Sequence, residues 1–212
     1  MSDEKFLHDL KAPLQGIFCC IQLMQSRLRG EESGISRYMD MLTENALDME
    51  RLLRNAFDAE HLREGTSKCV MRRGDAAQTV RSVCRQYMPI AERQGIDFAW
   101  NLPENAYAVF DEDKIRRILQ NLLINAMRFT PCGGRVRVNM RVDENICIFV
   151  SDTGCGIAES EREKIFDEGY THGGEGMGLY IARAFARLHG GDVTVRSNLG
   201  QGSCFCVKFS NN

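Results

Sequence analysis

The sequence has no long apolar run, no marked excess of charge of one sign and no N-terminal targeting pattern. None of its apolar stretches approaches the roughly 20 residues that a membrane-spanning helix needs. The start, Met1–Lys5, lacks the architecture of a signal peptide. A formal net charge of −2 at pH 7 gives no basic field for nucleic acid or an anionic membrane. We therefore expect a cytoplasmic location, no membrane segment in this chain and no nucleic-acid partner.

The cysteines show none of the spacings that mark a metal site or a disulfide framework. The 9 cysteines include no Cys-x-x-Cys pair, and the 4 histidines do not cluster with them. We expect reduced thiols that pack as small apolar side chains. Cys155, between two loop glycines, is the one singled out for redox sensitivity, although inert packing is the favoured interpretation.

Apolar residues in the first part of the chain follow a seven-residue repeat. Over residues 3–28 they recur in alternating steps of three and four, which is typical of a coiled-coil seam: Leu7, Leu10, Leu14, Ile17, Ile21, Met24 and Leu28. Gly30–Gly34 interrupts this helix, and a second one is expected over residues 35–62. Two such helices form an antiparallel hairpin. A lone hairpin leaves apolar surface wet, so we predict that two hairpins pair into a four-helix bundle, and hence a homodimer.

His8 lies roughly opposite this seam, so the first helix is expected to present it to solvent. Its position alone favours an ordinary surface histidine near a helix end. The alternative is an exposed imidazole nucleophile, with the neighbouring Asp9 to take or orient its proton.

From Cys69 onward helices alternate with strands, so the fold class is expected to be α+β. The domain boundary is placed in the Gly-Thr-Ser stretch, which divides residues 1–64 from residues 65–212. Asp75 and Asp111 are expected to cap two helices. The expected helices cover residues 75–94, 111–129, 159–166 and 179–189, and the expected strands cover residues 96–102, 135–142, 146–150, 192–197 and 203–209.

Three polar residues share one face of the helix expected over residues 111–129. Asn121 and Asn125 are four apart, and Arg128 follows three later. Asparagine is a poor helix former, so an aligned pair suggests a site. Amide oxygens can hold Mg²⁺, and an arginine can face phosphate oxygens. A solvated polar face is the alternative.

Two glycine-rich loops complete the candidate features. Asp152–Ile157 directly follows an apolar strand and suits the close approach of a flat ring whose amine donates to Asp152. Gly173–Gly178 places glycines immediately before a helix, where exposed backbone amides suit phosphate. A tight turn and a flexible linker are the respective alternatives.

Five segments, in this order, resemble the motifs of sensor histidine kinases of two-component systems. They are similar to the family's phosphoacceptor box, Asn box and three glycine boxes: Phe6–Leu14, Asn121–Pro131, Asp152–Ile157, Gly174–Leu179 and Gly200–Ser203. The resemblance covers nearly the whole chain. It implies a dimerisation and phosphotransfer hairpin, followed by an α/β sandwich ATP-binding domain of the Bergerat type.

The resemblance also implies the roles of individual residues. His8 would be the phosphoacceptor and Asp9 its proton acceptor, while Asn125, supported by Asn121, would hold Mg²⁺. The ATP-binding residues would be Asn121, Asn125, Arg128, Asp152, Gly154, Gly156, Ile157, Gly174, Gly176, Met177, Gly178, Leu179 and Ser203. The implied partners are the receiver domain of a response regulator and an upstream sensor domain or separate sensor protein. The chain could then be the cytoplasmic part of a membrane-bound sensor.

Two rival functions use similar parts. Bergerat-type ATP hydrolases carry Glu where this chain has Asn121, and an asparagine cannot act as a general base for water. A phosphotransfer scaffold would keep the hairpin but lose ATP binding, which the intact glycine loops disfavour. Within the phosphoacceptor box, Ala12 stands where the family often has Thr or Asn to orient water, so this position gives no support for phosphatase activity.

Overall fold

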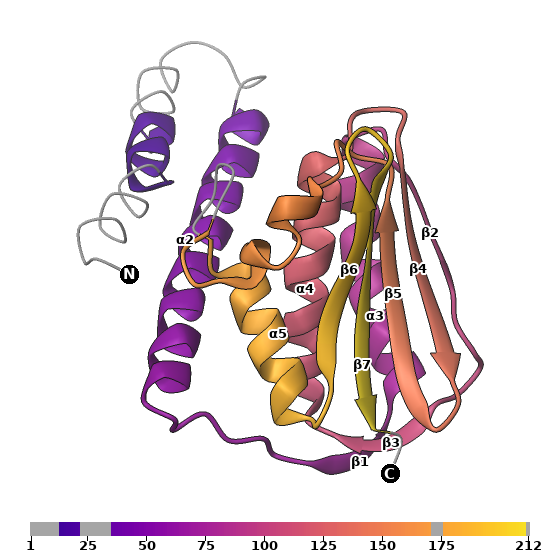
Figure 1. Cartoon of the computed structure of the whole chain (residues 1–212). Helices are drawn as coiled ribbons and strands as arrows, with labels where there is room; N and C mark the ends of the chain where they lie inside the picture. The colour runs from indigo at the N-terminus through magenta and orange to yellow at the C-terminus, as the bar shows by residue number, and fades with distance from the viewer. Residues whose placement is uncertain (1–12, 22–34, 171–175, 211–212) are drawn as a thin grey trace.

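The computed structural model describes residues 13–21, 35–170 and 176–210. They form a helical N-terminal part and an α/β body that lies beside it (Figure 1). His8, Asp9, Ala12 and Gly174 lie outside the described residues, so their expected roles stay predictions. No helix in the described ranges is long and apolar enough to cross a membrane.

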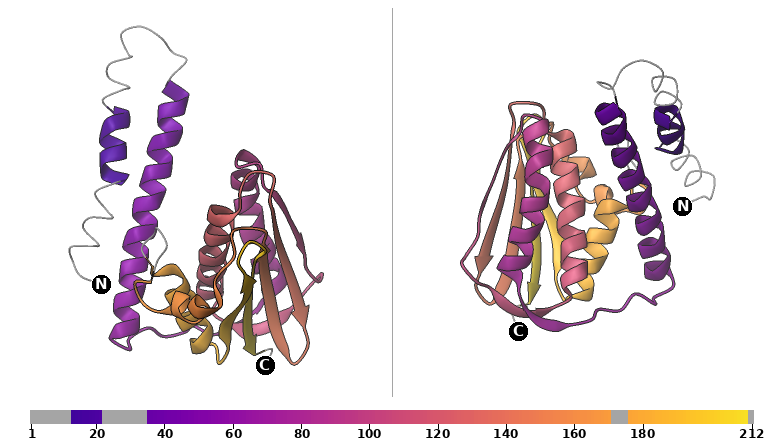
Figure 2. Two further views of the ribbon diagram at one scale, coloured as in Figure 1. Left: turned by 45° about the horizontal axis from the view of Figure 1, so that its top comes forward. Right: turned by 180° about the vertical axis from the view of Figure 1, so that it is seen from behind.

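The N-terminal part consists of two neighbouring helical segments, residues 13–21 and α2 (Ile35–Arg63). They lie side by side in all ribbon views (Figures 1 and 2), and Gly16 faces the side chain of Asn45. The helix expected over residues 35–62 is therefore confirmed. Leu14 and Ile21, expected on the seam, are exposed in the single chain, whereas Cys20 is buried.

The body is built on a five-stranded sheet with the strand order β2-β4-β5-β7-β6. Its strands are β2 (Asp97–Asn101), β4 (Arg135–Val142), β5 (Asn145–Asp152), β6 (Asp192–Asn198) and β7 (Gly202–Ser210). β2 runs parallel to β4, and the other neighbours are antiparallel. The expected strands are confirmed, and β5 lies in the centre of the sheet and ends at Asp152.

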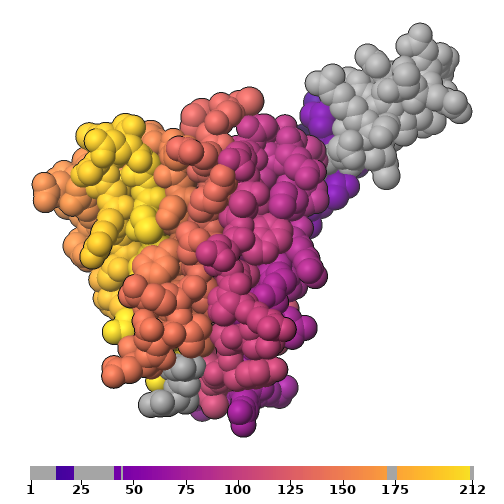
Figure 3. All heavy atoms as spheres, turned by 90° about the vertical axis from the view of Figure 1, so that its right-hand side faces the viewer, coloured from indigo at the N-terminus to yellow at the C-terminus, as the bar shows by residue number. Residues whose placement is uncertain are grey.

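Three helices cover one face of this sheet: α3 (Ala76–Arg93), α4 (Glu112–Phe129) and α5 (Gly178–Leu188). Figure 2 shows this layer from behind, and in the described part of the chain no helix covers the opposite face (Figure 3). Both expected caps are present. Asp75 accepts from the backbone N of Ala77 at 3.0 Å, and Asp111 accepts from the backbone N of Lys114 at 3.1 Å. These caps satisfy amide groups that a helix start leaves unpaired.

Short elements differ from the expectation. β1 (Arg72–Asp75) pairs with β3 (Tyr107–Phe110) in a separate two-stranded sheet that the sequence did not predict. The helix expected over residues 159–166 is wrong, because this segment forms two 3₁₀ turns, η2 (Glu159–Glu161) and η3 (Lys164–Phe166). Its buried apolar residues, Ile165 and Phe166, are adjacent rather than one helical turn apart. They therefore provide no continuous face to hold an α-helix.

A polar contact joins α2 to the body. The guanidinium of Arg117 on α4 donates to Asp58 Oδ2 at 2.7 and 3.2 Å and to Asn55 Oδ1 at 3.0 Å. Asn55 is only 1% exposed, so the contact is shielded from water. Near the C-terminal end of α2, Nε of Arg63 lies 3.8 Å from Oε1 of Glu168. The end of α2 is therefore docked on the body, and the domain boundary near residue 64 stays a prediction.

Candidate functional site

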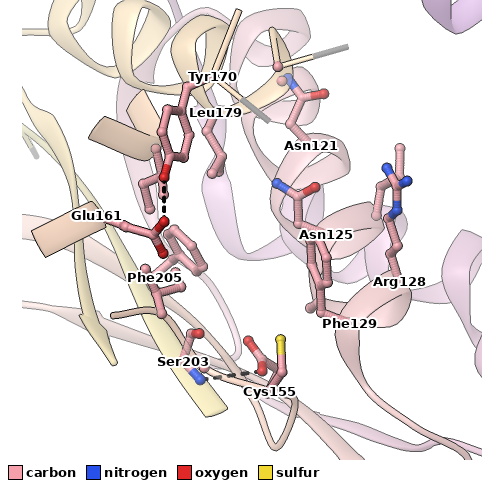
Figure 4. Close-up of a pocket in the computed structure, with 18 of the residues that line it drawn as sticks. Asn121, Asn125, Arg128, Phe129, Cys155, Glu161, Tyr170, Leu179, Ser203 and Phe205 are labelled. Atoms are coloured by element: carbon pink, nitrogen blue, oxygen red, sulfur yellow. Dashed lines mark hydrogen bonds between the residues drawn. The ribbon is translucent and has the colours of Figure 1, made fainter. Parts of the chain in front are cut away.

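The expected binding residues converge on one cavity of about 450 Å³ (Figure 4). Its walls come from α4, the loop after β5, the start of α5, β7 and α2. The volume lies within the range of small-molecule sites. The expected residues that line the cavity are Asn121, Asn125, Arg128, Asp152, Gly156, Ile157, Gly176, Gly178, Leu179 and Ser203.

Two expected residues lie beside the cavity rather than in its wall. Gly154 is buried in the loop after β5. Met177 directly precedes α5 and is part of the hydrophobic core, where it is 1% exposed. Their contribution to binding stays a prediction.

Asp152 forms the polar point at one end of the cavity. Its Oδ1 accepts from Gly154 N at 2.8 Å and from Ser203 N at 3.3 Å, and Figure 4 shows the second bond. Among the described residues no hydrogen bond reaches Oδ2, which keeps its lone pairs for a ligand donor. Burial raises the pKa of Asp152, against the opposing effect of the two amides.

The loop after Asp152 is fixed by its neighbours. Gly200 N donates to Cys155 O at 2.7 Å, and Ile157 N donates to Ser197 Oγ at 2.8 Å. Gly156 has φ +70°, and a Cβ there would lie 1.9 Å from Asn198 O. At Gly154 a Cβ would lie 2.4 Å from Phe129 O. Only glycine fits these close approaches, so the two loop glycines hold Asp152 in place.

The α4 wall carries the two asparagines. Asn121 is 4% exposed, and its Nδ2 has no hydrogen-bond partner among the described residues. Asn125 follows one turn later on the same face, and Figure 4 shows both across from Ser203 and Phe205. The start of α5 packs close to Asn121, since a Cβ on Gly178 would lie 3.3 Å from Asn121 Oδ1. A buried unpaired donor is costly and suits a ligand acceptor such as a phosphate oxygen.

Apolar side chains form much of the remaining wall. They come from segments far apart in the sequence: Phe129, Ile157, Ile165, Leu179, Leu199 and Phe205. Leu199 is 68% exposed and Phe129 is 39% exposed. Tyr170 donates to Glu161 Oε1 at 2.7 Å on the same rim (Figure 4). Such walls suit a flat aromatic ring beside the acceptor of Asp152.

The amide donor set, the acceptor at Asp152 and the apolar walls together fit an adenine nucleotide. The oxygens of Asn125 and Asn121 are of the type that Mg²⁺ prefers. In the described ranges no group of three or more His, Cys, Asp or Glu side chains is arranged to hold a metal. The residues present therefore fit a cation bound together with a nucleotide, and Asn125 and Asn121 are the ones that would hold it.

Sequence reasoning missed part of this wall. Arg51 and Asn55 of α2 line the cavity. Both lie before the expected domain boundary, whereas all the expected binding motifs lie after it. Nothing local marks them, because their role depends on how α2 docks. Leu199 could have been found, since an apolar side chain in a polar turn between β6 and β7 is unusual.

The cysteine expectation is borne out in part. All cysteines in the described residues are free. Cys19, Cys132 and Cys155 are exposed, so they do not pack as buried apolar side chains, and Cys155 also lines the cavity. The redox sensitivity of Cys155 stays a prediction.

The C-terminal half of the chain matches a known protein family. Residues 110–212 match the family described as histidine kinase-, DNA gyrase B-, and HSP90-like ATPases. This stretch begins at the end of β3 and contains α4, both loops and the whole cavity wall contributed by the body. The body of the molecule is therefore similar to the ATP-binding domains of this ATPase family.

Relatives over nearly the whole chain narrow the class. The adaptive-response sensory kinase SasA of Synechococcus sp. (strain JA-3-3Ab) is 31% identical over 213 residues, which cover 94% of this chain and 56% of the relative. The chain is therefore similar to sensor histidine kinases over nearly its whole length, and residues 110–212 match the ATPase family that includes the histidine kinases. It spans 22% and 56% of the length of two curated relatives that it matches, so it corresponds to a part of them.

Solved structures agree with the fold. Full-length ShkA in complex with AMPPNP has a TM-score of 0.70 at 26% identity, covering 100% of this chain and 47% of that one. Acinetobacter baumannii histidine kinase AdeS has a TM-score of 0.72 at 19% identity, covering 97% of this chain and 98% of that one. The expected fold class, a helical N-terminal part followed by an α/β ATP-binding domain, is confirmed.

Proposed function

We propose that this chain is an ATP-dependent protein histidine kinase. It phosphorylates its own His8 and passes the phosphoryl group to an aspartate of a response regulator. The observation that carries the proposal is the cavity, which joins the acceptor of Asp152 at one end to the unpaired Nδ2 of Asn121 at the other. Similarity to sensor kinases along nearly the whole chain supports the same function.

The residues divide the work by position. Asp152 accepts from the adenine amine, apolar walls enclose the ring, and the Gly176–Gly178 backbone faces the phosphates. Asn125, supported by Asn121, would hold Mg²⁺, which would neutralise charge on the phosphates when bound. An imidazole nitrogen of His8 attacks the γ-phosphorus, the bond to the ADP oxygen breaks, and Asp9 takes the imidazole proton. Phosphoryl transfer needs chiefly this positioning and charge neutralisation.

The rival hydrolase lacks its base here. Among the described residues, Glu161 is the only glutamate that lines the cavity, and it accepts a hydrogen bond from Tyr170 on the rim. Position 121, where a hydrolase would need its general base, carries an amide. A phosphotransfer scaffold would not need the nucleotide-sized cavity that the glycine loops border.

Labelled ATP separates the candidates. With γ-labelled ATP, the wild type should acquire acid-labile label, and His8→Ala should acquire none because the nucleophile is gone. Asn125→Ala should lose most of the label, because the residue that would hold the cation is gone. Asn139→Ala changes an exposed asparagine on β4 outside the cavity and should behave as the wild type.

The other outcomes identify the rivals. Released phosphate without protein label would indicate a hydrolase. Neither signal, in the presence of a folded protein, would indicate a scaffold. Label on His8→Ala would exclude His8 as the acceptor.

The proposed partners follow from the same function. They are a second copy of the chain, the receiver domain of a response regulator and an upstream sensor domain or separate sensor protein. Exposed apolar side chains gather on the helical part and support the homodimer: Leu14, Phe18, Ile21, Met41, Leu47, Leu53 and Phe57. A cytoplasmic location stays a prediction.

A further inference from the structure

One wall of the nucleotide cavity comes from α2, outside the ATP-binding domain. Arg51 and Asn55 line it together with Asn121 and Asn125 of α4. The matched family stretch begins at residue 110, so these α2 residues are no part of it.

Helix periodicity explains how Arg51 reaches the cavity. Arg51, Asn55 and Asp58 are separated by four and three residues, so they share one face of α2. Arg117 of α4 binds both Asp58 and Asn55. The two helices run in opposite directions (Figure 1), so one turn back along α2 corresponds to one turn forward along α4. Arg51 therefore lies on the level of Asn121, where both line the cavity.

The lining of the cavity carries charges of both signs, with the carboxylates of Asp152 and Glu161 balanced by two arginines. Of the described residues that line it, Arg51 and Arg128 are the cationic ones. Arg128 is exposed and lies over the ring of Phe129 at 5.7 Å. The side chain of Arg51 is 32% exposed, and its Nε lies 3.5 Å from Oδ1 of Asp48, which is itself 63% exposed. Burial raises the pKa of Tyr87 to about 12, while the positive charges of Arg117 and Arg51 act to lower it.

We propose that Arg51 is a nucleotide-binding residue whose guanidinium contacts the terminal phosphate of ATP. The proposal rests on the proposed kinase function. Asp152 fixes the ring at the far end, and the asparagines of α4 lie at the phosphate end. The terminal phosphate is the group that must face the hairpin, because the hairpin carries the acceptor. A guanidinium on α2 meets it from that side and matches phosphate oxygens in a bidentate manner.

Binding of two nucleotides by the full chain tests this role. Affinities for AMPPNP and ADP, each with Mg²⁺, are measured by calorimetry for the wild type, Arg51→Gln and Arg51→Lys. We expect Arg51→Gln to lose roughly tenfold or more in AMPPNP affinity, with a clearly smaller loss for ADP. Arg51→Lys should recover part of the loss, because it keeps the charge but not the planar fork.

Arg54→Gln is the matched control. Arg54 lies on the same helix, pairs with Glu50 and is 54% exposed. It should bind both nucleotides as the wild type does. Unfolding temperatures of all variants separate lost contacts from lost structure.

The outcomes are distinct. Unchanged AMPPNP affinity in Arg51→Gln, or equal losses for AMPPNP and ADP, would overturn the assignment of Arg51 while leaving the kinase proposal intact. A wild type that binds neither nucleotide would instead overturn the proposed function.

Discussion

At the scale of single residues, Asp152 has the most constrained environment in the cavity. Both of its protein hydrogen bonds reach Oδ1, and burial raises its pKa. The carboxylate therefore takes up its proton at a higher pH than an ordinary aspartate does. A protonated carboxyl has fewer lone pairs to offer an adenine amine.

Nucleotide affinity should therefore fall as the pH falls through the raised pKa of Asp152. The effect on folding has the opposite sign, because a raised pKa means that the folded chain favours the protonated form. That contribution is fully present below the ordinary pKa and is lost as the pH rises through the raised value. Asp152→Asn should weaken binding roughly tenfold and remove this pH dependence, as measured by nucleotide titration at several pH values.

Asp143→Asn serves as the control for this change. Asp143 lies in the exposed turn between β4 and β5, where it pairs with Arg141 at 3.1 Å. It should bind nucleotide with the wild-type affinity and pH profile. An unchanged affinity in Asp152→Asn would exclude Asp152 as the ring acceptor.

The residues of the site could be predicted where the motif is local. Asp152 and its glycines form one loop, and Asn121 and Asn125 lie on one helix face, so spacing alone was sufficient. Arg51 could not be predicted, because nothing in the sequence around it specifies which surface α2 meets. Its place follows from the contact of Arg117 with Asp58, formed between residues 59 apart in the chain.

At the scale of elements, periodic segments were predictable and short ones were not. α3 and α4 carry clear caps and apolar faces, and β4 alternates buried and exposed residues along its first half. β1 and β3 have 4 residues each, too few to establish a period, and their pairing depends on the fold around them. The 3₁₀ turns η2 and η3 were missed for the related reason that a single turn has no repeat.

The contact between α2 and α4 should contribute measurably to stability. The side chains of Arg117 and Asp58 are 13% and 24% exposed, so water screens their charges less than at the surface. A double-mutant cycle of Arg117→Ala and Asp58→Ala should give a coupling of about 2 kcal/mol in the free energy of unfolding. Urea unfolding measures it.

An exposed pair on the same helix calibrates this value. Arg54 and Glu50 are 54% and 58% exposed, and their coupling should stay below about 1 kcal/mol. If the two cycles gave the same coupling, docking through Arg117 and Asp58 would contribute nothing beyond an ordinary surface pair.

At the scale of the whole molecule, the helical part presents apolar surface that one chain does not cover. Phe18 is 60% exposed and Phe57 is 64% exposed. Such surface is costly in water and marks an interface. Because the seam residues Leu14 and Ile21 are also exposed, a second hairpin is the natural cover.

Phe18→Glu should therefore shift the chain from dimer to monomer, since a carboxylate in an apolar interface loses its hydration without a partner. Sedimentation equilibrium measures the mass. Val70→Glu changes an equally exposed apolar residue before β1, outside the two N-terminal helical segments, and should remain a dimer. A monomeric wild type would contradict the expectation.

The central position of β5 limits how far the cavity can open at the end formed by Asp152. Each edge of this strand is bonded to a neighbour, β4 on one side and β7 on the other. Its amides can exchange with solvent only when these pairings break, which requires a free energy close to that of global unfolding. The end of the cavity at Asp152 is thus anchored to a strand whose amides are expected to exchange slowly. Local opening that admits or releases a ligand is therefore expected at the opposite wall, where α2 meets α4 through the side chains of Asn55, Asp58 and Arg117.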